Sequence, residues 1–398
     1  MPGVGLPAQV SELPTPESFL SSEGITLGDF RVTTDLEAGY GWTNNAWQDS
    51  SHESGTQRIL SVSSAAQPVT EKRIIAASFD FFGQSFIEEE FSALNMNSLS
   101  GNLFGRFQLG EHVAWRGLLK RDETILGLSQ EDKINGIQAG TEIADQVEAA
   151  FEWDNERLFY SIMGRNIDLV TDMFEETSFG YVENTLDRRE TDFIAFAGKY
   201  FDWGRAYLFA GSQEIRYSSP RKHVLVNRDS DENRLGFGAE YSNGKWSGAV
   251  DAYVFTQDFV SPVIQDVDNE IVGSISAVYA AGEALSYTIE LERDFAETNF
   301  AGSAGLFTDR MFAGISLSPR DNAYVKVGPT VSTISVVNTP LEIDISSLDL
   351  EASWAFSPKF KAFLRTTVAL TETSGAGGAL SFLDAQAATT YLTLSYSL

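Results

Sequence analysis

The sequence contains no cysteine, few histidines and prolines (3 and 11), and half as many basic as acidic residues. Without cysteine, the chain has no disulfide framework, no thiolate metal site and no thiol nucleophile. Lysine and arginine number 28 against 56 aspartates and glutamates, which gives a formal net charge of −28. Nucleic-acid binding requires clustered basic residues that neutralise phosphates. The charge therefore excludes nucleic acid as a partner.

Long hydrophobic runs are also absent, although 43% of the 398 residues are hydrophobic. A membrane-spanning helix needs roughly 18–20 consecutive apolar residues, and no stretch approaches that length. The mean hydropathy lies close to zero. This average fits a soluble protein, and it equally fits a membrane barrel whose strands alternate apolar and polar residues.

Prolines are concentrated at the beginning, at positions 2, 7, 14 and 16. We interpret residues 1–24 as a Pro-rich periplasmic tail and residues 25–398 as one domain, because clustered prolines favour an extended segment. No charged segment followed by an apolar stretch marks a signal peptide. Since the remainder has the pattern of an exported protein, we expect the numbering to be that of a processed or trimmed form.

From Gly24 onward the dominant pattern is alternation of apolar and polar residues, the period of a β-strand. The segment LSYTIELE at 285–292, for example, places Leu, Tyr, Ile and Leu on one face and Ser, Thr and two Glu on the other. This pattern predicts eighteen strands, at 26–42, 57–69, 73–86, 99–110, 112–124, 137–152, 157–169, 191–202, 206–218, 233–243, 246–259, 269–281, 285–298, 306–318, 322–335, 345–357, 359–372 and 388–398.

The predicted connections alternate strictly between short and long. Short connections have turn chemistry, such as Asn243-Gly244, whereas long ones such as 170–190 are polar and acidic. Asn-Gly favours a two-residue hairpin turn because both positions tolerate positive φ. An outer-membrane barrel has an even strand number, short periplasmic turns and long outer loops. We therefore predict an all-β, antiparallel transmembrane outer-membrane β-barrel of about 18 strands, with both termini periplasmic.

The last predicted strand, TYLTLSYSL, ends on an apolar face at Leu398. It resembles the C-terminal signal read by the barrel assembly machinery, in which the usual final residue is phenylalanine. The opening strand also carries a resemblance, through Gly24, Leu27, Gly28, Phe30, Leu36, Gly39, Gly41 and Asn45. A second similar stretch is NRDSDENRLGFGAEY at 227–241.

These two stretches resemble the "β-barrel porin 2" family, although Thr33-Thr34 stands where that family often carries a proline. The resemblance covers roughly residues 24–398. It implies an exit pore of the bacterial outer membrane for a secreted polysaccharide of the exopolysaccharide or capsule type. It also implies a periplasmic polysaccharide export protein as the partner.

Few residues could support catalysis. The three histidines are His52, His112 and His223, and His112 has no Gly-x-Ser-x-Gly elbow nearby. A barrel hydrolase would need a serine beside a histidine. We expect turn or surface histidines and no enzyme activity.

Two acidic segments, 172–176 and 229–232, contain carboxylates that could take Ca²⁺ or bridge lipopolysaccharide phosphates through divalent ions. Solvated acidic loops are the simpler interpretation. We expect no other metal and no cofactor, with outer-membrane lipids and lipopolysaccharide as the surroundings.

Strand parity also predicts which charged residues face the lumen. They are Arg31, Asp35, Glu37, Arg106, Arg116, Lys120, Glu142, Glu148, Glu152, Arg165, Lys199, Glu214, Arg216, Arg234, Glu240, Asp251, Glu290, Glu292, Asp349, Glu351, Lys361 and Arg365. Cross-strand pairing and hydration of the wall explain most of them. A polymer path would use the rest for weak contacts at many points. The lumen aromatics Phe104, Phe363 and Tyr391 could stack on sugars or only pack.

Outward aromatic residues predict girdles at the membrane interfaces. They are Tyr40, Trp42, Trp115, Trp153, Trp203, Tyr241, Trp246, Trp354 and Tyr396. Asp145 falls on the nominal lipid face, so either it lies near the outer rim or the predicted register slips there.

Three functions remain open at this point. The first is an exit conduit for a polysaccharide, the second a general diffusion porin for small hydrophilic solutes, and the third a surface interaction or assembly scaffold with a plugged lumen.

Overall fold

The computed structural model describes residues 25–27, 30–45, 53–68, 73–88, 95–126, 140–173, 187–218, 227–297, 303–375 and 384–397. The predicted tail at 1–24, His52, His223, the 174–176 part of the first acidic segment, and Leu398 lie outside these ranges. Among the described residues, no helix is long and apolar enough to cross a membrane.

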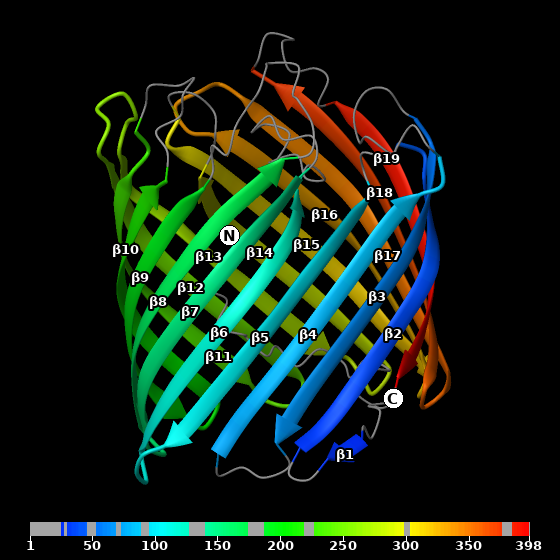
Figure 1. The fold of residues 1–398 in the computed structure, drawn as a ribbon, viewed down its shortest axis with the longest axis horizontal. Coiled ribbons are helices and arrows are strands. Elements are labelled where there is room, and N and C mark those ends of the chain that lie inside the picture. The colour runs from blue at the N-terminus through cyan, green and yellow to red at the C-terminus, as the bar shows by residue number, and fades with distance from the viewer. Residues whose placement is uncertain are drawn as a thin grey trace.

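The described residues form one antiparallel β-barrel (Figure 1). Its strands are β1 (Ile25–Leu27), β2 (Phe30–Thr43), β3 (Gly55–Pro68), β4 (Arg73–Phe86), β5 (Met96–Gln108), β6 (Val113–Leu126), β7 (Gly140–Asp154), β8 (Leu158–Met173), β9 (Arg188–Phe201), β10 (Gly204–Tyr217), β11 (Ser230–Ser242), β12 (Trp246–Phe259), β13 (Val267–Ala280), β14 (Leu285–Glu297), β15 (Gly305–Arg320), β16 (Ala323–Val336), β17 (Glu342–Ser357), β18 (Phe360–Ser374) and β19 (Ala385–Ser397).

Each strand from β2 to β19 pairs with its neighbours in sequence, and β19 pairs with β2 to close the ring. The closing register runs from Thr389 opposite Thr43 to Ser397 opposite Asp35. The short β1 folds back on the start of β2, with Ile25 opposite Val32. Closure gives every long strand two partners, so the described sheet has no terminal strand with a wholly unpaired edge.

The eighteen-strand prediction is confirmed, and for β4 and β12 even the predicted bounds agree. The other predicted bounds differ from the observed ones by up to about four residues, and the first segment, predicted as one strand from 26, divides into β1 and β2. The described short connections such as 243–245 join strand ends at one end of the barrel, and the strand ends that flank the longer connections lie at the other. Gly244 has φ of +83°, the left-handed conformation expected of the Asn-Gly turn.

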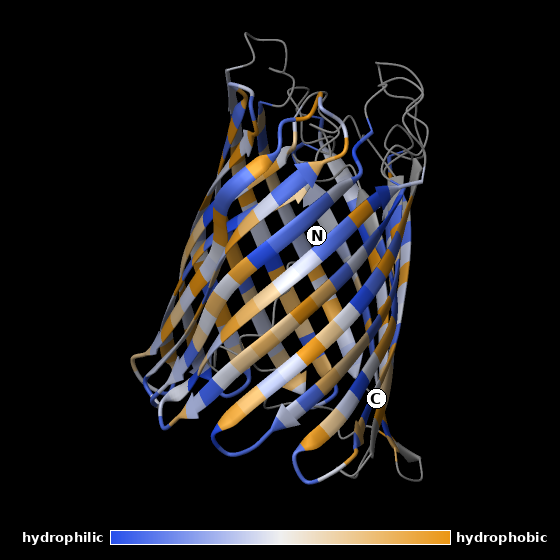
Figure 2. Cartoon of the chain, turned by 90° about the vertical axis from the view of Figure 1, so that its left-hand side faces the viewer, coloured by the Kyte–Doolittle hydropathy of each residue, from blue (hydrophilic) through white to orange (hydrophobic). Residues whose placement is uncertain are grey.

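Alternate residues on each strand face outward and form an apolar outer surface, and the strands show this as alternating colours in Figure 2. Leu208 and Leu235, on neighbouring strands, are 65% and 67% exposed. The opposite face of each strand is more buried, because the inner side of a curved wall is concave. Apolar packing inside the barrel includes a cluster of Leu306, Ile334, Val336, Leu341 and Ile343 near the long-loop end.

Candidate functional site

The inner wall is the candidate site, and the cross-strand register identifies its residues. On β9, residues 188, 190, 192 and 194 are buried, whereas the alternate residues, including Phe193, are exposed. Residues directly opposite each other in a sheet share a face, so the register carries this assignment around the barrel. The wall then divides into a packed sector and an open sector.

The packed sector contains a buried ionic group on β8 to β11, which we call the β8–β11 ionic group. Asp192, 1% exposed in its side chain, lies between two arginines. Its Oδ2 is 2.7 Å from Arg165 Nη2, and its Oδ1 is 3.4 Å from Arg234 Nη2. Arg234 also contacts Glu232 Oε1 through Nε at 3.1 Å and donates from Nη2 to Gln213 Oε1 at 2.7 Å.

The register explains why these side chains meet. Arg165 stands opposite Asp192, and Asp192 stands opposite Gln213 on the next strand. Arg234 stands opposite Gly211, where a Cβ would stand only 3.3 Å from the arginine Cγ, so the glycine leaves room for the arginine stem. Two arginines and two acids balance their charges, as buried ionic groups require.

A second set of ion pairs lies beside it on β5 to β7. Arg116 contacts Glu148 at 3.2 Å and Glu152 at 3.3 Å, and Arg106 contacts Glu152 at 3.2 Å. These side chains are only partly buried. The ion pairs therefore link neighbouring strands across a hydrated part of the wall.

An aromatic track crosses the same sector of the inner wall from the short-turn end toward the long-loop end. Its rings belong to Tyr200, Phe159, Tyr207, Phe196, Phe209, Tyr253 and Phe255. Successive ring centroids are 5.1 to 6.4 Å apart, the separation of interacting aromatic pairs. The track is therefore one continuous line of ring contacts and not a set of isolated rings, and its members Tyr207, Phe209 and Phe255 are buried.

Glycines on adjacent strands let three of these rings lie against the wall. A Cβ at Gly198 would stand 2.3 Å from the Phe159 ring, and one at Gly236 would stand 2.5 Å from the Phe209 ring. At Gly238 the distance to the Tyr207 ring would be 2.2 Å. The rings occupy the space that side chains would fill, so their faces run along the wall and do not cross the lumen.

Polar groups border the track. Tyr207 donates its hydroxyl to Asp251 Oδ2 at 3.0 Å. Arg205 pairs with Glu240, and its guanidinium lies 5.7 Å from the centre of the Phe159 ring and 6.0 Å from that of Tyr207. These contacts fix the rings and place hydrogen-bonding groups beside them.

The open sector, on β14 to β18, carries charged residues around an inner hollow of about 220 Å³. Glu290, Arg310, Lys326, Asp349, Glu351 and Arg365 line it. Its ion pairs are long: Arg310 Nη1 to Glu292 Oε2 and Arg365 Nη2 to Glu351 Oε2 are both 3.9 Å. The side chains of Arg365 and Glu351 are 66% and 38% exposed. This sector therefore presents solvated charges to the lumen.

Most of the predicted lumen residues lie on the inner face. They are Arg31, Asp35, Glu37, Arg106, Arg116, Lys120, Glu142, Glu148, Glu152, Arg165, Arg234, Glu240, Asp251, Glu290, Glu292, Asp349, Glu351, Lys361 and Arg365. Phe104, Phe363 and Tyr391 share that face.

Three predicted lumen residues lie on the outer face, so the prediction was wrong for Lys199, Glu214 and Arg216. Lys199 shares its face with Phe193 and Phe201 and stands opposite Leu158. Glu214 and Arg216 lie at the long-loop end of β10, where both contact outer-face partners. All three are close to strand ends, where a charge on the outside costs little because water and headgroups are near.

Because these residues were assigned to the wrong face, the prediction for β9 and β10 also turned the main residues of the site outward. Because β9 has apolar residues on both faces, placing Lys199 inside turned Asp192 and Glu190 outward. On β10 it turned Tyr207 and Phe209 outward. A one-residue error exchanges every side chain between faces. The signal that could have corrected it is the acidic and aromatic series Glu190, Asp192, Phe196 on alternate positions.

The predicted girdle residues all lie outside, and most gather at the short-turn end. Trp115, Trp153, Trp203, Tyr241, Trp246, Trp354 and Tyr396 are at this end, whereas Tyr40 and Trp42 are near the long loops. Ring contacts extend the short-turn belt, as between Trp246 and Tyr279 at 4.6 Å and between Trp153 and Tyr160 at 5.3 Å. Asp145 does face outward, near the long-loop rim, and pairs with Arg121 Nη1 at 3.3 Å.

The acidic segment 229–232 does not converge on one point. Asp231 faces outward to Arg216, whereas Glu232 faces inward to Arg234. Asp229 accepts a hydrogen bond from the Tyr217 amide at 2.8 Å. In the described part of the chain, no group of three or more His, Asp or Glu side chains could hold a metal ion.

Solved structures with the same fold are outer-membrane barrels. The FrpB iron transporter of Neisseria meningitidis (F3-3 variant) aligns over 92% of this chain and 66% of its own, with a TM-score of 0.50 and 11% identity. OccK1 (OpdK), an outer membrane protein of Pseudomonas aeruginosa, aligns over 92% and 98%, with a TM-score of 0.50 and 10% identity.

The structure of OpdK with vanillate gives the same TM-score and identity. The chain spans about two thirds of the length of FrpB. At these identities the likeness shows the fold alone. No protein-family model matches the sequence. No curated protein matches it either.

Proposed function

We propose that this barrel is a pore of the bacterial outer membrane through which a polysaccharide chain of the exopolysaccharide or capsule type leaves the cell. The observation that carries the proposal is the aromatic track on the inner wall. Sugar rings have one apolar C–H face that stacks on an aromatic face and a rim of hydroxyls that bond to polar groups. The partly exposed rings of Tyr200, Phe159, Phe196 and Tyr253 are the surfaces open to a sugar, backed by the buried rings of Tyr207, Phe209 and Phe255. Arg205 and Asp251 lie beside them.

A conduit must bind its cargo weakly at many points, because one strong site would stop movement. The charged side chains near the track pair with one another, as Arg234 does with Asp192 and Glu232. Pairing lowers the field that an isolated arginine would exert on an acidic or neutral sugar. Stacking along the track then supplies contacts of similar strength at successive positions.

The outer surface supports placement in the outer membrane. It has an apolar band between the strand ends and an aromatic belt at the short-turn end. In that orientation the short turns and both ends of the barrel chain face the periplasm. A periplasmic export protein would then deliver the polysaccharide at the short-turn end.

Two experiments test the proposal. Deleting the gene should abolish one surface polysaccharide, and a deletion strain with unchanged polysaccharides would refute the export function. In planar bilayers, long oligosaccharides should block the current of the pore, and Phe196→Ala with Tyr253→Ala should weaken that block severalfold. Block that is unaffected by both substitutions would remove the track from the path.

A general diffusion porin for small hydrophilic solutes is the second candidate. The open sector favours it, because the exposed side chains of Arg365 and Glu351 resemble the wet charges of a solute channel. OpdK, which has this fold, has been solved with vanillate, a small aromatic acid. A diffusion porin would conduct steadily without a partner and would show no block by long oligosaccharides.

A further inference from the structure

The wall between β13 and β14 is only partly paired. Their register extends from Gly273 opposite Arg293 to Ala280 opposite Ser286. Within the described strands, residues 267–272 of β13 pair with β12 alone, and residues 294–297 of β14 pair with β15 alone. The two hairpins therefore separate above Gly273, toward the long-loop end.

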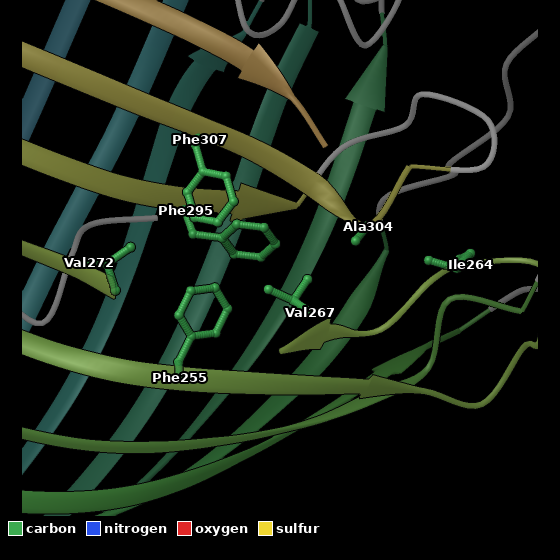
Figure 3. Packing of buried hydrophobic residues seen from close by; sticks show 7 residues of the cluster. All are labelled: Phe255, Ile264, Val267, Val272, Phe295, Ala304 and Phe307. Carbon is green, nitrogen blue, oxygen red and sulfur yellow. The ribbon is translucent and has the colours of Figure 1, made fainter. Parts of the chain in front are cut away.

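The tip of the β14–β15 hairpin, by which we mean its described residues 294–297 and 303–308, lies on the lumen side of β12 and β13. By register, Phe295 and Phe307 belong to the outer face of their hairpin, since Phe307 shares the face of Asp309 and the exposed Met311 and stands opposite Phe295. Yet both rings pack against Phe255, from the inner face of β12, at 4.9 and 6.3 Å between centroids. Figure 3 shows the three rings grouped between the two hairpins.

Two further contacts hold the tip in this place. Leu306, from the other face of the hairpin, is fully buried against Val336 and Ile343, so both faces of the tip are covered. The buried guanidinium of Arg228, which precedes β11, donates to the carbonyl oxygens of Ser303 at 2.9 Å and Ala304 at 2.8 Å. If this hairpin end faced lipid, one of its two faces would be exposed. The burial of both faces therefore supports its place on the lumen side.

The inward turn leaves a groove on the outside of the barrel. It has a volume of about 600 Å³ and extends over the outer faces of β11 to β16. Outward residues line it, among them Phe237, Val250, Ile271, Leu291, Met311 and Val331. Several of them are largely exposed, and they belong to the same apolar band that covers the rest of the barrel.

Small residues form the floor of the groove. Gly273 and Ala252 stand opposite each other on β13 and β12. A Cβ at Gly273 would stand 2.1 Å from the carbonyl oxygen of Asp251, so the backbone itself closes this point. At the upper edge, Arg293 is held by Asp309 Oδ2 at 3.0 Å and Glu270 Oε2 at 3.7 Å. The charges mark where the apolar lining ends.

We infer that this groove, the β13–β14 groove, is a binding site for one acyl chain of a membrane lipid. The groove opens from the lipid-facing band, so in the membrane it must be filled by hydrocarbon or water. Its apolar lining gives water few partners. A chain in the groove contacts more apolar protein surface than a chain on the flat wall, and burial of that surface favours the groove.

The lining predicts which part of the lipid is recognised. Arg293 is paired with two acids, so it offers no free positive charge to a phosphate. Binding should therefore depend on the acyl chain of the lipid and not on its headgroup. Zwitterionic and anionic phospholipids of equal chain length should be retained equally.

Native mass spectrometry of the full chain released from detergent micelles tests the site. The protein would first be reconstituted in vesicles of phosphatidylcholine or phosphatidylglycerol and then washed in detergent. We expect one phospholipid to remain bound to the native protein, with either headgroup. Ala252→Leu, which fills the floor, should reduce the retained fraction at least fivefold.

Ala210→Leu is the matched control, since Ala210 is an outward alanine on β10 away from the groove. It should retain lipid like the native protein, and both variants should keep the native heat-modifiable band on gels. Equal retention in the two variants would refute the site, as would an absence of retained lipid from the native protein. Retention of phosphatidylglycerol but not phosphatidylcholine would refute recognition through the acyl chain of the lipid.

A fluorescence measurement locates the bound chain. Because the native chain has no cysteine, Val331→Cys at the groove and Leu392→Cys on the outer face of β19, outside the groove, each accept one fluorophore. After loading with brominated-chain lipid and washing, the Val331 reporter should stay at least twofold quenched, whereas the Leu392 reporter should recover. Equal recovery of both reporters would place the retained lipid elsewhere.

Discussion

The packed sector and the open sector of the inner wall contain the same types of charged residues in different environments. In the β8–β11 ionic group, Asp192 and Arg234 are 1% and 7% exposed and have several partners each. In the open sector, Arg365 and Glu351 are far more exposed and lie 3.9 Å apart. The difference shows that an inward charge in this barrel is either part of the packing or part of the aqueous surface, and burial distinguishes the two.

Asp192→Ala should have the largest effect on stability. It would leave Arg165 and Arg234 without their shared carboxylate in a dry part of the wall, at a cost of about 3–5 kcal/mol. Urea unfolding in vesicles, followed by tryptophan fluorescence, measures it. Glu351→Ala is the matched control and should cost within about 1 kcal/mol, because its pair is solvated. Similar losses in both variants would erase the distinction between the sectors.

Phe209→Ala should come next, at about 3 kcal/mol, because it removes a buried ring and leaves a cavity above Gly236. The same unfolding measurement applies. Phe363→Ala, at an inner and only partly buried ring of the open sector, should cost clearly less. An equal cost would mean that the aromatic track is no better packed than the open wall.

Arg365→Glu should change ion selectivity while leaving the free energy of unfolding within about 1 kcal/mol. It replaces one positive charge on the lumen surface by one negative charge, a change of −2, so the pore should become more selective for cations. Reversal potentials across a KCl gradient measure the shift. Lys199→Glu makes the same change on the outer face and should leave the reversal potential unchanged, and a shift there would return Lys199 to the lumen.

Lys199→Met should have the smallest effect. A lysine on the lipid face costs about 2–4 kcal/mol at the midplane and about 0–1 kcal/mol near an interface. Because Lys199 lies two residues from the end of β9, the gain in unfolding free energy should be about 1 kcal/mol or less. A gain above about 2 kcal/mol would show that the short-turn rim is deeper in the bilayer than the aromatic belt suggests.

Periodicity and turn chemistry were sufficient to predict the barrel, since alternation and the short–long order of connections persist through the whole chain. They were insufficient where both faces of a strand are apolar. On β9, the run FIAFAG gives no contrast between faces, so the predicted phase was wrong and Asp192 was missed. Only contact with β8 and β11 decides which face turns inward.

The β14–β15 tip shows a second limit. Phe295 and Phe307 alternate correctly for a lipid-facing surface, yet they are buried inside the ring of strands. What places them there is contact with β12 and a clamp from Arg228, more than 70 residues away in sequence. The alternation of residues along one strand contains no information about a contact between distant strands. The β13–β14 groove, which depends on that contact, could therefore not be predicted from the sequence.

Closure of the ring has a consequence for assembly. Every pairing but one joins strands that follow each other in sequence, whereas the seam brings Thr43 and Thr389 together across 346 residues. Contacts between distant residues form slowly because a long loop must close first. We therefore expect the hairpins to form early and the β2–β19 seam last. Until then two unpaired edges are open to other chains, so the protein is most vulnerable to aggregation in the moments before its final contact.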